Sequence, residues 1–188
     1  MHGALKRNPA ARWFRPVALF LLPLALGCGY RFAEAPGQGP MLPLFVTVLQ
    51  NRTPETGLET RVTNDLVREL TADSRFQLSD QAGGDNVLSG SILSILEDSA
   101  SRQVSGRSRE RRLRVTVSLS LANRGGRVIW RNATLREFET FAVAAEDPGL
   151  TTENRSQALD RLSARLARKV RFELGTVLDS FGKSGDSR

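Results

Sequence analysis

The sequence predicts an α+β fold in two layers, with two helices packed on one face of a mixed β-sheet of four or five strands. Two observations predict it. Two segments far apart in the chain repeat apolar residues every three or four positions, which is typical of amphipathic helices. The segments before and between them are β-branched or alternate apolar with polar residues, which is typical of strands. Since each helix has one apolar face, the simplest packing places both on one side of the sheet.

The first half of the domain is expected to be strand, helix and strand. Residues 44–50 are apolar and rich in β-branched side chains, and turn-forming residues 51–54 follow them. A helix is expected at 57–72, because apolar residues recur there at every fourth position. A short strand at 75–79 should lie at an edge of the sheet. The apolar stripe of the helix consists of Leu58, Val62, Leu66 and Leu70.

The centre of the sheet is expected from residue 87 onward. Residues 87–96 are apolar on both faces, and Gly90 indicates a bulge within this strand. Residues 112–121 alternate strictly between apolar and polar, so one face should be buried. Asn123-Arg124-Gly125-Gly126 accepts positive φ angles, so a hairpin with the strand 127–141 should follow. Three of its apolar residues share one parity, which places them on one face: Val128, Trp130 and Phe138.

A long helix is expected at the end of the domain, after a loop through Asp147-Pro148-Gly149. Thr151 or Thr152 could cap it, so it should begin near Glu153. Apolar residues then recur every three or four positions as far as Phe181. The remaining residues, 182–188, are small and polar and are expected to be disordered.

The N-terminus has the layout of a signal peptide. Basic residues precede an apolar run that is too short to span a membrane, and Cys28 follows it. The segment Leu24-Ala25-Leu26-Gly27-Cys28 resembles a bacterial lipobox, which implies removal of residues 1–27 and acylation of Cys28. The alternative is an ordinary secretory signal with an incidental cysteine. If Cys28 is acylated, residues 28–43 form an acylated N-terminus with a flexible tether, and residues 44–181 form a single domain.

Signal removal changes the apparent chemistry of the chain. Four of the 27 Lys and Arg residues precede Cys28 and none of the 20 Asp and Glu does, so the net charge falls from +7 to +3. The only histidine, His2, is lost, and an acylated Cys28 has no free thiol. The mature chain therefore lacks the commonest catalytic groups, and we expect no enzyme, no metal site and no cofactor. Glu97 and Asp98 should point to opposite faces of their strand and are interpreted as solvated charges.

A group of arginines is the only candidate binding site. Guanidinium groups bind phosphate bidentately, so the group could bind an anionic lipid or glycolipid head group. The alternative is a solvated loop and strand face. Aromatic platforms for stacking bases are absent, so nucleic acid is not an expected partner. The arginines are Arg102, Arg107, Arg109, Arg111, Arg112 and Arg114.

Several segments of the mature chain resemble the lipopolysaccharide-assembly lipoprotein family LptE. Just before Val87, family members usually have an Ala-Asp pair, whereas this chain has Asp85-Asn86. The resemblance is carried, in order, by Cys28-Gly29-Tyr30-Arg31-Phe32, Val48-Leu49-Gln50-Asn51-Arg52-Thr53, Gly57-Leu58-Glu59, Asp65-Leu66-Val67-Arg68-Glu69-Leu70, Arg75-Phe76, Val87-Leu88-Ser89-Gly90-Ser91-Ile92, Arg112-Leu113-Arg114-Val115-Thr116-Val117 and Gly126-Arg127-Val128-Ile129-Trp130.

The resemblance implies a two-helix α+β domain that is anchored to the outer membrane through Cys28, on its periplasmic side. It also implies insertion into the lumen of the barrel protein LptD, assembly of lipopolysaccharide (LPS) at the cell surface and LPS binding, which the arginine group fits. Gly29 favours outer-membrane delivery, because Asp at that position generally retains lipoproteins in the inner membrane. Two other interpretations remain open: a structural or adaptor lipoprotein of the envelope, and a secreted enzyme that uses carboxylates and serine.

Overall fold

The computed structural model describes residues 41–79, 85–100 and 110–185, all within one compact unit, Gly37–Arg188. Residues 1–40, which include the predicted signal peptide, Cys28 and the tether, lie outside this description. So do three members of the predicted arginine group, Arg102, Arg107 and Arg109.

The predicted α+β class is confirmed. Two helices, α2 (Leu58–Thr71) and α3 (Pro148–Gly185), accompany a mixed six-stranded sheet in the described residues. The strand order is β3-β1-β4-β5-β6, and β2 pairs separately with β4. β1 runs parallel to β3 and β4, whereas β4, β5 and β6 are antiparallel neighbours. The strands are β1 (Leu42–Val46), β2 (Gln50–Asn51), β3 (Phe76–Leu78), β4 (Asn86–Ser99), β5 (Glu110–Asn123) and β6 (Val128–Ala142).

The sheet has one strand more than expected because the predicted strand 44–50 is split into β1 and β2. Between them the backbone turns inward at Leu49, whose side chain is only 2% exposed. The Leu49 amide donates a hydrogen bond to Thr63 Oγ1 on α2 at 3.1 Å instead of to a neighbouring strand. The Thr47 amide bonds the Leu88 carbonyl at 3.0 Å, which keeps the segment against β4. A helix side chain thus interrupts the strand.

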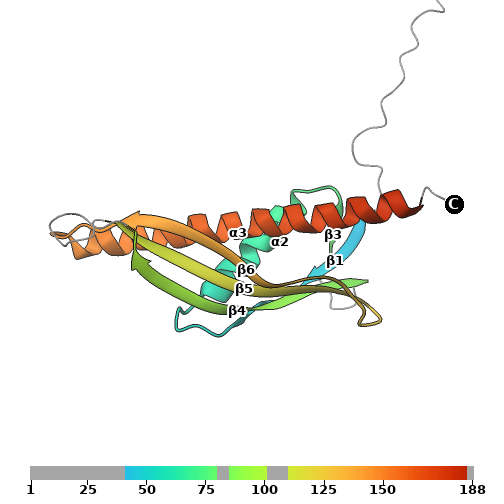
Figure 1. The fold of residues 1–188 in the computed structure, drawn as a ribbon, viewed down its shortest axis with the longest axis horizontal. Coiled ribbons are helices and arrows are strands. Elements are labelled where there is room, and N and C mark those ends of the chain that lie inside the picture. The colour runs from blue at the N-terminus through green and yellow to red at the C-terminus, as the bar shows by residue number, and fades with distance from the viewer. Residues whose placement is uncertain (1–40, 80–84, 101–109, 186–188) are drawn as a thin grey trace, which may run out of the picture. The chain divides into compact units, whose positions relative to one another are not determined.

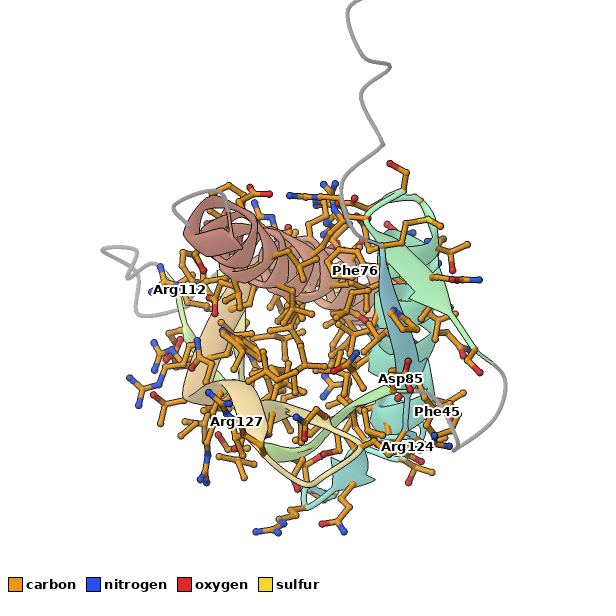
Figure 2. All side chains as sticks on the ribbon, turned by 90° about the vertical axis from the view of Figure 1, so that its right-hand side faces the viewer. Phe45, Phe76, Asp85, Arg112, Arg124 and Arg127 are labelled. Atoms are coloured by element: carbon orange, nitrogen blue, oxygen red, sulfur yellow. The ribbon has the colours of Figure 1, made fainter. Side chains whose placement is uncertain are left out.

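Both helices cover the same face of the sheet, with α3 along β6 and α2 beside α3 (Figure 1). The apolar stripe of α2 faces inward as predicted. The alternation in β5 is confirmed as well, because its odd-numbered apolar residues are at most 1% exposed. Figure 2 shows the side chains that fill the space between α3 and the sheet. The buried residues shared by these elements include Val62, Leu66, Leu70, Leu88, Ile92, Leu113, Val115, Val117, Leu119, Leu121, Leu162, Leu166 and Val170.

The bulge expected at Gly90 lies further along β4. Gly90 pairs in register with Leu119, and the register shifts only between Ile92 and Ser94. Glycine is needed at position 90 for a different reason. A Cβ there would collide with the Ser118 carbonyl oxygen and lie 2.7 Å from Leu119 Cδ2. The sequence prediction therefore found the irregular strand but gave Gly90 the wrong role.

The expected common face of Val128, Trp130 and Phe138 is wrong. Two register shifts between β5 and β6 change the parity along β6. Trp130 lies opposite the buried Leu121 and packs on the core, whereas Phe138 lies opposite Arg114 on the other face and is 50% exposed.

Helix α3 begins five residues earlier than expected. The Asp147 carboxylate accepts a hydrogen bond from the Leu150 amide at 2.9 Å, so Asp147 is the N-cap and Pro148 occupies the first helical position. The predicted loop is therefore the helix start. Thr151, one of the two expected caps, instead bonds the backbone of Ala144. The helix continues to Gly185, past its expected end at Phe181, and residues 186–188 lie outside the described residues.

Side chains of α3 also bond the outer edge of β6. Lys169 Nζ donates to the Arg136 carbonyl oxygen at 3.1 Å, and Arg165 Nη1 donates to the Phe138 carbonyl oxygen at 3.2 Å. Backbone acceptors that an edge strand would otherwise present to other chains are therefore occupied along this stretch.

Candidate functional site

The described arginines of the predicted group are divided between the two faces of the sheet. Arg111, Arg112 and Arg114 lie at the start of β5. Because successive strand residues point to opposite faces, Arg111 shares the helix side with Leu113, and the other two lie on the opposite side. The expected cluster is therefore two sites with different surroundings.

On the helix side, Arg111 belongs to a chain of ion pairs. Arg111 Nη1 donates to Glu97 Oε1 at 2.8 Å, and Arg155 Nε donates to Glu97 Oε2 at 3.2 Å. The other two nitrogens of Arg155 bind both oxygens of Glu55 at 2.9 and 2.7 Å. This Glu55 network joins the segment before α2 to α3, β4 and β5. Its role in the structure is to hold these four segments together.

The network perturbs the titration of its carboxylates. The hydrogen bonds from Arg155 hold the pKa of Glu55 below its ordinary value despite partial burial. Burial of Glu97 acts to raise its pKa, but the hydrogen bonds from Arg111 and Arg155 outweigh it, and the pKa is also lowered. The carboxylates in turn raise the pKa of Arg155. Glu55, Glu97 and Arg155 are therefore charged near neutral pH, and Glu97 is not the simple solvated charge that was expected.

On the opposite side, Arg112 and Arg114 are part of a mixed cationic and apolar surface. The Arg112 guanidinium lies 5.2 Å from the centroid of the Phe138 ring, and its Nε is buried without a hydrogen-bond partner. Arg114 pairs with Asp98 at 3.3 Å and faces Leu96, which is 53% exposed. We call the surface formed by Leu96, Arg112, Arg114 and Phe138 the outer patch.

The outer patch lies far from the N-terminal end of β1. Leu44 of β1 pairs with Asn86 at the start of β4, whereas Arg112 pairs with Asp98 near its other end. At roughly 3.3 Å per strand residue, the two ends of β4 are about 40 Å apart. Figure 1 shows the start of β1 at one end of the sheet and the end of β4 at the other.

Arginines with half-exposed apolar neighbours can bind an anionic amphiphile, because guanidinium binds phosphate and the apolar side chains contact hydrocarbon. Among the described residues, no group of three or more His, Cys, Asp and Glu is placed to hold a metal ion. Glu55 and Arg155 were missed by the sequence analysis. They are 100 residues apart, and no local pattern indicates that they meet.

The comparison with protein families decides the identity at family level. The model of the lipopolysaccharide-assembly family LptE matches residues 42–174, which begin with β1 and end in α3. The chain belongs to the LptE family. The predicted resemblance is thereby confirmed for the domain.

Solved structures support the LptE fold assignment. Rare lipoprotein B from Shewanella oneidensis is similar with a TM-score of 0.54 and 12% identity, covering 73% of this chain and 98% of its own. A hypothetical protein from Chlamydia trachomatis has a TM-score of 0.53 and 11% identity, with 73% and 98% coverage. At such identities the likeness concerns the fold. No curated protein sequence matches.

Through its LptE membership, this chain belongs to a lipopolysaccharide-assembly family. Rare lipoprotein B is a lipoprotein, and its fold is similar. Within the described part of the chain, neither helix is both long and apolar enough to cross a membrane.

Proposed function

We propose that this protein is a non-enzymatic outer-membrane lipoprotein that works with an LptD-like β-barrel to assemble LPS at the cell surface. It would be anchored through acylated Cys28 on the periplasmic side and act as a plug and assembly factor for the barrel. The observation that carries the proposal is the LptE family match, which extends over residues 42–174 and so spans nearly the whole described domain.

We further propose that the outer patch binds the phosphates and acyl chains of LPS. Arg112 and Arg114 provide the positive charge, while Leu96 and Phe138 provide half-exposed apolar contacts beside it. Arg107 and Arg109 precede this strand in the sequence and belong to the same proposed site. Arg111 is assigned to the Glu55 network instead, since its guanidinium is paired with Glu97.

Partner identification tests the assembly role. A tagged protein is purified from detergent-solubilised membranes, and an outer-membrane β-barrel is expected to co-purify. Depletion of the protein is expected to reduce surface LPS. Purification without any barrel, together with unchanged surface LPS, would instead favour a structural or adaptor lipoprotein of another complex.

LPS binding is tested separately with the purified protein. The double variant Arg112→Ser/Arg114→Ser is expected to weaken LPS binding while barrel association is retained. Arg131→Ser/Arg136→Ser removes the same charge from exposed positions on β6 and serves as the matched control. Equal LPS affinity in both double variants would remove the outer patch from the proposal.

A further inference from the structure

The end of the domain at which β1 begins has an exposed apolar surface that the proposed function does not use. Met41 is 54% exposed, Val128 is 51% exposed, and Phe172 is 73% exposed. A hollow of about 400 Å³ is lined by the start of β1, the β5–β6 turn and α3, and a second is lined by Trp130 and α3. We call this surface, formed by Met41, Val128, Trp130, Phe172 and Leu178, the proximal surface.

The two hollows are lined by neighbouring residues of β6 and α3. The first hollow is lined by Val128 and Ile129 of β6 and by Leu178 of α3. The second is lined by Trp130 of β6 and Val177 of α3. Large contiguous apolar regions on a protein surface are usually sites of association with a partner or a membrane. The proximal surface is at the opposite end of the sheet from the outer patch, so it requires its own occupant.

The short distance in sequence between Cys28 and Met41 indicates that the occupant of the proximal surface is a bilayer. Met41 is both the first described residue and a lining residue of the first hollow. Cys28 precedes it by 13 residues in the sequence. Thirteen residues of chain cannot span more than about 45 Å. If Cys28 is acylated as proposed, this end of the domain therefore remains close to the bilayer surface.

The chemistry of the surface fits a bilayer as well. Tryptophan and other large apolar side chains favour the boundary between head groups and acyl chains. Arg127 lies at the rim of the first hollow, is exposed and has no ion pair within the described residues. Figure 2 shows Arg127 on the β6 side of this end, apart from Arg124 and Asp85. An arginine there can contact an anionic head group.

We propose that, in the protein free of its barrel partner, the proximal surface docks on the anionic bilayer that holds the acylated N-terminus. Met41, Val128 and Phe172 enter the acyl boundary, and Arg127 contacts head-group phosphate. This orients the domain with its outer patch away from that bilayer. The inference goes beyond the proposed function and rests on it for the acylation of Cys28.

Trp130 makes the proposal measurable. The chain has two tryptophans, and the other, Trp13, precedes Cys28. In a Trp13→Phe background, the fluorescence of the full protein reports on Trp130 alone, whether or not the signal peptide has been removed. The protein is mixed with excess vesicles of phosphatidylethanolamine and phosphatidylglycerol whose acyl chains are brominated near the head group. Quenching of Trp130 relative to unbrominated vesicles is the expected result.

Two matched triple variants complete the test. Met41→Ser/Val128→Ser/Phe172→Ser is expected to abolish the quenching. Val48→Ser/Val67→Ser/Leu150→Ser alters exposed apolar residues outside both the proximal surface and the outer patch and is expected to retain it. Circular dichroism of both variants verifies that they are folded. Arg127→Ser is expected to reduce quenching in vesicles with phosphatidylglycerol but not in pure phosphatidylcholine.

Several results would overturn the proposal. One is the absence of quenching in the parent protein, and another is unchanged quenching in the proximal triple variant. A third is self-association of the parent protein that the proximal triple variant abolishes while its quenching is unchanged. That result would make the proximal surface an interface between copies of the chain. Flotation of the Cys28→Ala protein measures the anchor separately, and barrel co-purification measures the proposed function. Failure of either is thus distinguishable from failure of docking.

Discussion

Arg155 of α3 binds both carboxylate oxygens of Glu55, at 2.9 and 2.7 Å, although the two residues are 100 positions apart. The third nitrogen of the same guanidinium reaches Glu97 on β4. One arginine therefore fixes the start of the long helix to the segment before α2 and to the sheet.

Arg155→Met should destabilise the domain by about 1 to 2 kcal/mol, because it leaves two partly buried carboxylates without their main partner. The loss is limited because the Arg155 side chain is 31% exposed. Urea denaturation measures the change. Arg168→Met is the control, since the ion pair between Arg168 and Glu69 is longer, at 3.9 Å. Similar midpoints for the two variants would contradict a central role for Arg155.

Stability should fall on acidification. The pKa values of Glu55 and Glu97 are lower in the folded protein than their ordinary value of 4.5. Their contribution is therefore present above about pH 5 and is lost as the pH falls through the folded pKa values. The midpoint of urea unfolding is measured from pH 7 to pH 3. Glu55→Gln/Glu97→Gln should flatten this profile, and an unchanged acid slope would disprove the assignment.

Gly90→Ala should destabilise the protein by about 1 to 3 kcal/mol, since the added methyl group collides with the backbone of β5. Thermal unfolding measures the effect. At Gly125, which has a negative φ angle, the nearest atom to an added Cβ is Asn123 Oδ1 at 3.4 Å. Gly125→Ala should therefore change stability little, and an equal loss in both variants would contradict a specific close approach at Gly90.

Thr63→Val should cost about 1 to 3 kcal/mol, because the buried Leu49 amide would lose its acceptor. Thr63→Ser keeps the hydroxyl and should restore most of that stability. Amide hydrogen exchange at Leu49 provides the local measurement. Exchange should accelerate in the valine variant relative to the serine variant, and equal protection in the two would show that the bond contributes nothing.

Much of the fold could be predicted because its signals are periodic. The stripe of α2 and the alternation of β5 each repeat several times, so both the element and its buried face follow from the sequence. Features that depend on a single residue were harder to predict from the sequence. Asp147 was interpreted as part of a loop, since Asp-Pro-Gly is typical of both turns and helix starts.

The candidate site was only partly predictable. Arginines at the start of β5 are visible in the sequence, and alternation already separates Arg111 from Arg112 and Arg114. Their partners are not visible, because Glu97 and Phe138 lie across strand pairings whose bulges shift the register. Pairings between distant residues require the tertiary structure, as the contact between Glu55 and Arg155 demonstrates.

The hydrogen bonds from α3 to the outer edge of β6 restrict how this protein can associate. The carbonyl groups of Arg136 and Phe138 already accept from Lys169 and Arg165. A strand from another chain would have to displace both cations before it could extend the sheet here. Along this stretch, the edge strand is therefore protected against the edge-to-edge strand pairing that leads to aggregates.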